Sequence, residues 1–226
     1  MTKLLLSDVQ PLDDPAVFER LYANASPERR RAADSFRFRK DKSLSIGAAA
    51  LLDRGLIAIG LREKDMRYGR NRYGKPFFPD MPRIHFSISH SSTKVAVAFS
   101  DAPVGCDIEQ VADIDLAIAE RFFSRVEYEA LMGMIPEERT RAFFRYWTLK
   151  ESYMKAAGLG LRLPTESFSV YPGQDSRASA DGNLPLKQFE LLSVESFEGY
   201  ECTLCRHPEE NVPEICIFTD WYTSGT

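Results

Sequence analysis

The segment Pro136 to Ala157 constrains the fold of this chain more than any other. Its sequence predicts one long helix, in which Trp147, Glu151 and Lys155 are spaced i, i+4 and therefore lie along one face. The other flank of the helix is apolar and carries Phe143, Phe144, Leu149 and Met154. This flank can pack on a core, which leaves the charged face available for a site.

A second acidic motif lies upstream, in residues 104–109. Read as a strand, this segment projects Asp107 and Glu109 from one face and buries Ile108 on the other. Alternating carboxylates usually mark a solvated edge strand, but two acids on one face repel each other unless a cation or base lies between them. If Glu151 joins them, three carboxylates and an ammonium suggest a hard-cation site that acts on phosphate.

The two motifs belong to a longer pattern. G-x-D-I-E at residues 105–109, followed by W-x-x-K-E-x-x-x-K at residues 147–155, resembles the 4'-phosphopantetheinyl transferase superfamily, specifically its Sfp type. Y-G-K-P at residues 73–76 and H-F-S-I-S-H-S at residues 85–91 resemble the upstream motifs of that family, in the same order. The similarity runs from about Ser26 to about Val170.

The resemblance implies an α+β fold of two similar halves, related by a pseudo-twofold axis, with the active site at their interface. For this chain we expect an N-terminal half, residues 1–106, that supplies nucleotide contacts. We expect a C-terminal half, residues 107–226, that supplies the metal site and the contacts to a carrier protein.

The rest of the sequence alternates between strand and helix patterns. Strands are predicted over residues 3–6, 84–89, 95–100, 104–109, 167–170, 188–194, 200–205 and 214–220. Helices are predicted over residues 16–23, from residue 26 onward, and over 44–58, 115–131 and 136–157. The segments 68–82 and 171–184 are rich in turn-forming residues, so we expect loops there, the second of them mobile.

The resemblance also implies roles for the charged residues. Asp107, Glu109 and Glu151 are expected to bind Mg²⁺, Glu151 to act also as the base, and Lys155 to neutralise the reacting phosphate. From the spacing alone, Glu151 and Lys155 equally fit a helix salt bridge that contributes roughly 0.3–0.5 kcal/mol. Lys150 lies one step round the helix and cannot share the orientation of Glu151, so we expect it in a structural pair elsewhere.

Five further residues are implied to bind coenzyme A together with Lys155: Arg29, Ser45, Lys75, Ser89 and His90. His90 and Ser89 are expected at the 3'-phosphate, and Lys75 in the adenine-nucleotide pocket. Considered alone, a histidine at a strand end is usually structural and a lysine in a turn usually solvated. The family commonly has an arginine where Leu44 stands, and Lys42 or Arg39 are the candidates to replace it.

The length, net charge and apolar content of the chain limit which kinds of partner it can bind. A chain of 226 residues with a formal net charge of −4 is not suited to broad nucleic-acid binding. No apolar stretch reaches the length needed to cross a bilayer, and four cysteines suit a reducing compartment. We therefore expect a cytoplasmic monomer that binds neither nucleic acid nor membrane.

The expected reaction is transfer of 4'-phosphopantetheine from coenzyme A to a serine of an apo acyl or peptidyl carrier protein, with adenosine 3',5'-bisphosphate as by-product. A Mg²⁺-dependent phosphohydrolase or nuclease would use similar clustered carboxylates, and a non-catalytic scaffold that binds carrier proteins is a third possibility. The surfaces favoured for carrier docking are the stripe Leu116, Ile118, Phe122 and Phe123 and the loop after Gly160. Such a stripe is more often core than interface.

Overall fold

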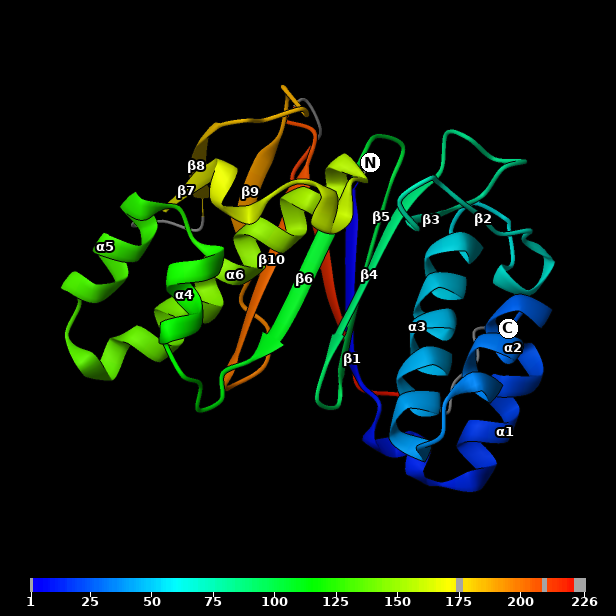
Figure 1. Ribbon diagram of the computed structural model, residues 1–226. Helices are drawn as coiled ribbons and strands as arrows, with labels where there is room; N and C mark the ends of the chain where they lie inside the picture. The colour runs from blue at the N-terminus through cyan, green and yellow to red at the C-terminus, as the bar shows by residue number, and fades with distance from the viewer. Residues whose placement is uncertain (1, 174–176, 209–210, 222–226) are drawn as a thin grey trace.

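The computed structural model describes residues 2–173, 177–208 and 211–221. In this part of the chain, two larger sheets meet at the centre of the molecule, and each carries helices on its outer side (Figure 1). One group of helices, α1 to α3, covers the first sheet, and the other group, α4 to α6, covers the second. The structure is therefore mixed α+β, as the sequence predicts.

The first sheet has the strand order β11-β1-β5-β4. Its strands are β1 (Lys3–Asp8), β4 (His85–Ser91), β5 (Lys94–Ser100) and β11 (Glu214–Phe218). Helix α3 (Arg39–Ile57) packs on this sheet, and α1 (Pro15–Asn24) and α2 (Pro27–Ser35) pack on α3. α2 begins where expected, because the Ser26 hydroxyl caps it by accepting the N–H of Arg29 at 3.2 Å and Pro27 is its first residue.

The second sheet has the strand order β6-β10-β9-β8-β7. Its strands are β6 (Gly105–Gln110), β7 (Phe168–Pro172), β8 (Arg177–Gly182), β9 (Glu190–Ser193) and β10 (Tyr200–Arg206). Helices α4 (Ala117–Phe122), α5 (Arg125–Gly133) and α6 (Pro136–Ala157) belong to this half. A two-stranded hairpin, β2 (Gly69–Arg70) and β3 (Pro76–Phe77), lies apart from both sheets.

A third hydrophobic core joins the two sheets. It combines alternate residues of β1 and β5 with alternate residues of β6 and β10: Leu4, Leu6, Ala96, Ala98, Cys106, Ile108, Cys202 and Leu204. The serines of β4 also bind the backbone of β6, because Ser87 Oγ accepts the N–H of Cys106 at 3.1 Å and Ser91 Oγ that of Gln110 at 3.0 Å. β4 and β6 are thus fixed side by side at the seam between the halves.

Three predictions of local structure are wrong. The loop expected over 68–82 contains the short strands β2 and β3, which pair with each other. The helix expected over 115–131 is two helices, because Ser124 starts α5 in a capping box with Glu127. The loop expected over 171–184 contains β8, which pairs with β7 and β9. Ala178 and Ala180 of β8 pack toward the core between exposed polar residues, a period of two that the turn-forming composition obscured. In the same segment, which was expected to be a mobile loop, residues 174–176 lie outside the described residues.

The chain crosses between the halves twice. The boundary expected between residues 106 and 107 lies inside β6, and the last strand, β11, returns to pair in parallel with β1. Trp221 then packs into the core of the first half. None of the four cysteines, all of which the structure describes, forms a disulfide. No helix among the described residues is long and apolar enough to cross a membrane.

Candidate active site

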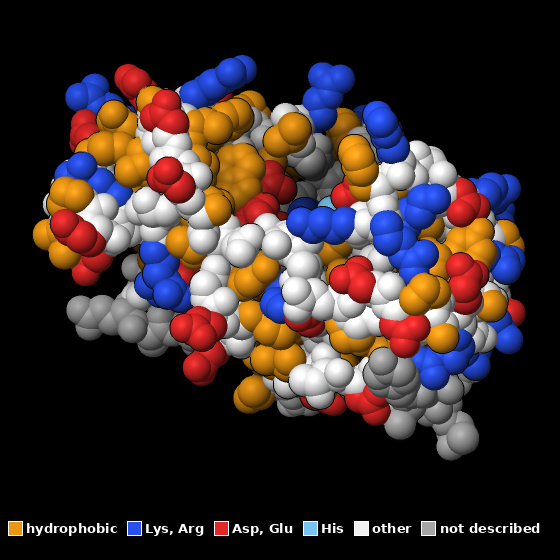
Figure 2. Space-filling view, turned by 90° about the horizontal axis from the view of Figure 1, so that it is seen from below, with side chains coloured by type: hydrophobic (Ala, Val, Ile, Leu, Met, Phe, Trp, Pro, Cys, Tyr) orange, Lys and Arg blue, Asp and Glu red, His pale blue; other side chains and the backbone are white. Residues whose placement is uncertain are grey.

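One cavity of about 500 Å³ gathers most of the predicted site residues. Its polar lining comes from three elements: Ser89 and His90 of β4, Asp107 and Glu109 of β6, and Glu151 and Lys155 of α6. Figure 2 shows a hollow near the centre of this face, with acidic side chains and a histidine at its bottom. Hydrophobic side chains border it on the side of α4 to α6, and Lys and Arg side chains on the side of α1 to α3.

Gly105 sets the distance between β6 and α6. A Cβ added at this glycine would lie 1.9 Å from the Ser152 carbonyl oxygen and 2.5 Å from the Ala156 nitrogen, both backbone atoms of α6. The strand and the helix therefore touch through their backbones, which only glycine permits. This contact brings Asp107, two residues further along the strand, beside Lys155 of the helix.

Asp107 and Lys155 form the centre of the site. Lys155 Nζ lies 2.6 Å from Asp107 Oδ1, and Ser89 Oγ donates to the same oxygen at 2.6 Å while it accepts from Lys155 at 2.9 Å. Burial, the largest single influence, would lower the pKa of Lys155, but the charge of Asp107, its hydrogen bond and the charge of Glu151 together contribute more, so the pKa lies above its ordinary value. The lysine is therefore held as an ammonium.

The other oxygen of Asp107 has no such partner. Asp107 is only 2% exposed, yet its Oδ2 is buried and makes no hydrogen bond to any residue that the structure describes. A buried carboxylate oxygen without a partner is costly, and it is a natural ligand for a hard cation. The residues present thus fit the Mg²⁺ ion that the resemblance implies.

Glu109 and Glu151 complete the acidic lining. Burial raises the pKa of both carboxyls; for Glu109, the Ser91 hydroxyl, which donates to Oε2 at 2.7 Å, partly offsets the rise. The predicted alternation of β6 is confirmed, because Ile108 is fully buried on the opposite face. As the side chains stand, no three acidic, histidine or cysteine residues in the described ranges form a group that could hold a metal. The three carboxylates share a cavity without converging on one point.

Lys150 turns away from this cavity, as expected. Its ammonium lies 2.8 Å from Glu127 Oε1, and it donates to the carbonyls of Thr165 at 2.8 Å and Phe168 at 2.6 Å. Lys150 and Glu127 are buried almost completely. The structural pair predicted for Lys150 is therefore present in the core of the second half.

An apolar wall borders the cavity on the side of the second half. Phe122, Trp147 and Leu161 line it, with the rings of Phe122 and Trp147 edge to face at 5.7 Å. Leu161, in the loop after Gly160, is 77% exposed. Phe123 is only 3% exposed and packs against Phe143 in the core, so its expected place on a docking surface is wrong.

Two smaller cavities extend the site toward the first half. Lys75, Pro76, Ile88 and Lys155 line a cavity of about 200 Å³, and Pro76 and Ile88 also line one of about 350 Å³ that contains Arg29. Because Ile88 lines all three cavities, they are neighbours around this side chain, and together we call them the depression. Its length suits an extended ligand better than a small one.

Arg29 is one of two cationic residues, with Arg70, that line the far end of this depression. Its guanidinium lies over the Tyr68 ring at 5.0 Å, and its Nε donates to the Tyr68 hydroxyl at 3.3 Å. Tyr68 in turn donates to the buried Glu63 at 2.6 Å. Arg29 Nη2 is buried and makes no hydrogen bond within the described part of the chain. One donor of the guanidinium is therefore left for a ligand.

Not every predicted nucleotide contact lies in this depression. Ser45 is half-buried on α3 and is not among the described residues that line the three cavities. Arg39, a candidate to replace the missing arginine at Leu44, lies over the Phe18 ring and donates to the Leu12 carbonyl at 3.1 Å. Arg39 is exposed, and these contacts hold its guanidinium against the first half.

Sequence reasoning missed the roles of Ser91, Tyr68 and Glu63. For Ser91 the sequence did contain a signal, because Ser87, Ser89 and Ser91 alternate and therefore lie on one face of β4. In the structure all three serines bind β6. Tyr68 and Glu63 had none, because their contacts depend on a loop and a short helical turn that meet only in the folded chain.

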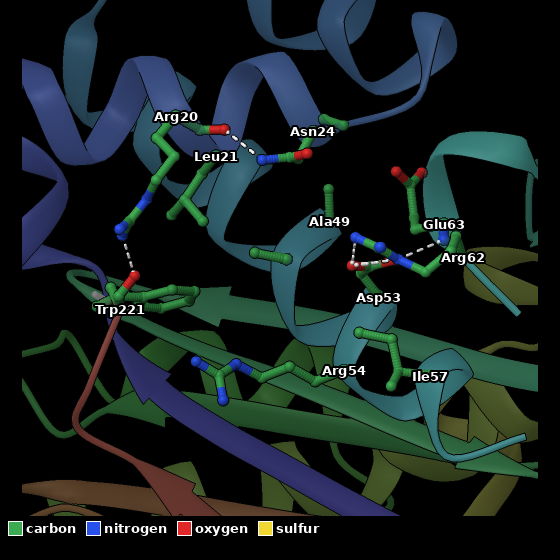
Figure 3. Close-up of a pocket in the computed structure, with 12 residues that line it drawn as sticks. Arg20, Leu21, Asn24, Ala49, Asp53, Arg54, Ile57, Arg62, Glu63 and Trp221 are labelled. Carbon is green, nitrogen blue, oxygen red and sulfur yellow. Dashed lines mark hydrogen bonds and ion pairs between the residues drawn. The ribbon is translucent and has the colours of Figure 1, made fainter. Parts of the chain in front are cut away.

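A further cavity lies away from this site, between α1, α3 and the end of the chain (Figure 3). Arg20 of α1 donates to the Trp221 carbonyl, and Arg62 forms a forked ion pair with Asp53 at 2.9–3.2 Å. Arg54 donates to the Asp220 carbonyl at 2.8 Å. These contacts tie the returning chain to the first half and explain the arginines there as structural.

Comparison with known proteins identifies the class of this site. The family model of the 4'-phosphopantetheinyl transferase superfamily matches residues 103–205. Over 194 residues the chain is 37% identical to the 4'-phosphopantetheinyl transferase Sfp of Bacillus subtilis, covering 84% of this chain and 86% of that protein. Over 206 residues it is 36% identical to the 4'-phosphopantetheinyl transferase gsp of Aneurinibacillus migulanus, covering 91% and 86%.

The chain therefore belongs to the 4'-phosphopantetheinyl transferase superfamily. Within it, the identity over most of the length to Sfp and gsp places the chain in the Sfp type. Its activity is that of a 4'-phosphopantetheinyl transferase.

Proposed function

We propose that this enzyme transfers the 4'-phosphopantetheine group of coenzyme A to a serine hydroxyl of an apo acyl or peptidyl carrier protein. The observation that carries the proposal is the single cavity in which Asp107, Glu109 and Glu151 face Lys155. Three carboxylates around an ammonium suit the charge of a reacting pyrophosphate once a divalent cation is added. The by-product is adenosine 3',5'-bisphosphate.

We assign proton transfer to Glu151 and neutralisation of the phosphate charge to Lys155. The serine oxygen forms a bond to the β-phosphorus, while the bond from that phosphorus to the bridging oxygen breaks. Glu151 accepts the serine proton, directly or through a water. Lys155, fixed by Asp107 and Ser89, offsets the negative charge on the transferring and leaving phosphates. The leaving group keeps the electron pair and departs as the nucleotide.

Asp107, Glu109 and Glu151 would hold Mg²⁺, and Asp107 Oδ2 is the oxygen most in need of it. When bound, the ion supplies positive charge next to the pyrophosphate. Ser91 and Ser89 hold Glu109 and Asp107 in place by donating to their carboxylates at 2.7 Å and 2.6 Å. The chain's own contribution is thus to hold its carboxylate oxygens in position.

The depression from Lys155 to Arg29 would take the nucleotide part of coenzyme A. Ser89 and His90 line the cavity of Lys155, and Arg29 lines the far cavity; we assign these three residues to the 3'-phosphate. Lys75 lines the middle of the depression. Ser45 lies outside the depression, so it would contact coenzyme A only if the bound ligand extends to α3.

The carrier would dock on the apolar wall. Phe122, Trp147 and the exposed Leu161 surround the opening, and Ile118 on α4 is 40% exposed. An apolar patch at the mouth of a charged cavity fits a partner that presents a serine between apolar side chains. We further infer that residues 1–106 and 107–226 are halves related by a pseudo-twofold axis, and that the enzyme acts as a cytoplasmic monomer.

Intact-mass measurement on carrier proteins tests the proposal. Apo-carriers from polyketide, nonribosomal-peptide and fatty-acid systems are incubated with the enzyme, coenzyme A and Mg²⁺. A gain of one phosphopantetheine mass on a carrier is expected, and its loss in EDTA is expected to be reversed by added Mg²⁺. Cleavage of coenzyme A without a gain in carrier mass would indicate a phosphohydrolase. Carrier binding with no reaction of coenzyme A would indicate a scaffold.

A further inference from the structure

The β2–β3 hairpin of the first half binds the end of α6 in the second half. Asn71 organises the hairpin, because its Oδ1 accepts the N–H groups of Tyr73 at 2.9 Å and Lys75 at 3.0 Å. Its Nδ2 then donates to the Gly158 carbonyl at 2.7 Å. Gly158 is the left-handed residue that ends α6. The turn before Pro76 is therefore fixed against the end of the helix that carries Glu151 and Lys155.

Lys75 extends this contact into the helix itself. Its ammonium donates to the backbone carbonyls of Lys155 at 2.6 Å and Ala156 at 3.5 Å. The last carbonyls of a helix lack partners within the helix and carry its negative dipole end, so a cation is favoured there. Lys75 thus caps the last turn of α6 from outside the helix.

The same ammonium also contacts β6. It donates to the Val104 carbonyl at 3.1 Å, one residue before Gly105, where the strand touches α6. A lysine ammonium has three N–H groups, and Lys75 has three carbonyl partners. Its donors are therefore all directed to the backbone, and burial lowers the pKa of Lys75 to about 8.

We propose that Lys75 and Asn71 form a clamp that holds α6 in register with β6, which makes Lys75 a positioning residue for phosphopantetheine transfer. The clamp joins the strand of Asp107 and Glu109 to the helix of Glu151 and Lys155 at their closest approach. Lys75 lines the nucleotide depression, but its ammonium is directed to three backbone carbonyls, so Lys75 acts on the reaction through Lys155. This role rests on the function proposed above.

Steady-state kinetics of Lys75→Met separate a positioning role from a nucleotide contact. Methionine keeps most of the stem and removes the ammonium. We expect kcat to fall about 10-fold, since small misplacements of reacting groups are costly, while the Kd of coenzyme A changes less than about 3-fold. A Kd weakened about 10-fold with kcat retained at saturation would overturn the clamp. Lys64→Met, an exposed lysine of a short helical turn, is the matched control.

A double-mutant cycle tests whether Lys75 acts through Lys155. In the Lys155→Ala background, Lys75→Met is expected to lower kcat by less than about 2-fold, because the group that it positions is gone. A full and independent 10-fold loss in that background would contradict the proposal.

Hydrogen exchange gives a readout that does not depend on the reaction. Amides of residues 154–159 should exchange faster in Lys75→Met and in Asn71→Ala than in wild type, with β1 and β5 unchanged. Unchanged exchange in that turn would overturn the clamp, even if wild type proved not to modify any carrier. If Lys75→Met fails to fold, Asn71→Ala decides the question by the same exchange and kinetic criteria.

Discussion

Helix α6 carries two lysines, five residues apart, and each pairs with an acid in a different region of the molecule. Lys150 lies 2.8 Å from Glu127, and Lys155 lies 2.6 Å from Asp107. The chemistry and the distances are nearly the same. The two pairs differ in what surrounds them, and that difference separates a structural ion pair from a functional one.

The Lys150–Glu127 pair is complete. Glu127 Oε1 accepts the N–H of Val170 at 2.7 Å as well as Lys150, and Oε2 accepts the N–H of Ser124 at 2.7 Å. The ammonium has two carbonyl partners besides Glu127, so no donor remains for a ligand. A buried pair satisfied in this way holds α5, α6 and β7 together.

The Lys155–Asp107 pair is incomplete. Asp107 Oδ2 is buried without a partner in the described residues, and two further carboxylates with raised pKa share the cavity. Such an arrangement is unfavourable for the protein alone and becomes favourable when a cation and a phosphate are bound. The comparison therefore predicts that the first pair governs stability and the second governs rate.

The largest effect is expected for Asp107→Ala. Loss of this carboxylate removes the partner of Lys155 and the unpartnered oxygen, so kcat/KM should fall by about 10³-fold or more. Stability should change little, because Lys155 is 28% exposed and can reach water. Transfer is measured by carrier mass and folding by thermal denaturation. Asp107→Asn, which keeps the shape, is the control, and turnover above about a tenth of wild type in either variant would refute the assignment.

Lys150→Met should produce the next largest effect, on stability alone. It leaves Glu127 as an uncompensated buried charge, which typically costs about 3–5 kcal/mol. Urea unfolding measures the loss, and the double variant Lys150→Met, Glu127→Leu is expected to regain most of it. Turnover per folded molecule should stay within about 3-fold. A loss of turnover without a loss of stability would make Lys150 part of the active site.

Lys155→Ala should lower turnover per folded molecule by about 10²-fold, a loss that destabilisation by the buried, unpaired Asp107 carboxylate cannot account for. The reason is that its ammonium offsets charge on the reacting phosphates, whereas as a helix salt bridge it would contribute little. Lys155→Arg should also be slow, since a planar guanidinium does not fit where a compact ammonium is held between Asp107 and Ser89. Turnover above about half of wild type in Lys155→Ala would exclude a catalytic role.

The sequence alone predicted the elements that carry the charged residues. The spacing of Glu151 and Lys155 and the alternation of Asp107 and Ile108 are local patterns, and local patterns survive folding when one face must be buried. The opposite orientation of Lys150 followed from the same helical geometry. The resemblance then indicated that strand and helix meet, which neither pattern shows alone.

The partners of these residues could not be predicted in the same way. Lys75 binds the end of α6, 80 residues away in sequence, and Ser89 reaches Lys155 across 66 residues. Such contacts depend on how the two halves are joined, and the local periodicity of the sequence contains no information about that. The strand β8 was missed for a different reason, since its alternation is short and made of small and polar residues that also favour turns.

The smallest effect is expected for the serines that hold the acids. Ser89 Oγ donates to Asp107 and accepts from Lys155, whereas Ser91 Oγ donates to Glu109 only and accepts a backbone N–H of β6. Removal of one neutral hydroxyl from a charged pair is worth about 1–1.5 kcal/mol, so Ser89→Ala should lower kcat by about 5- to 10-fold. Asp107 and Lys155 still touch directly in that variant, which limits the loss.

Ser91→Ala should lower kcat less, by about 2- to 5-fold, because Glu109 loses its hydroxyl partner while Lys155 keeps its hydrogen bonds to Asp107 and Ser89. It should instead weaken the response to Mg²⁺, seen as a higher Mg²⁺ concentration for half-maximal transfer, whereas Ser89→Ala should shift that value less. Ser89→Ala thus tests the side of the cavity where Lys155 offsets phosphate charge, and Ser91→Ala tests the side where Glu109 would bind the cation. An equal shift in both variants would mean that Asp107 and Glu109 act as one unit, and a loss of kcat in Ser91→Ala greater than in Ser89→Ala would place the reacting phosphate beside Glu109.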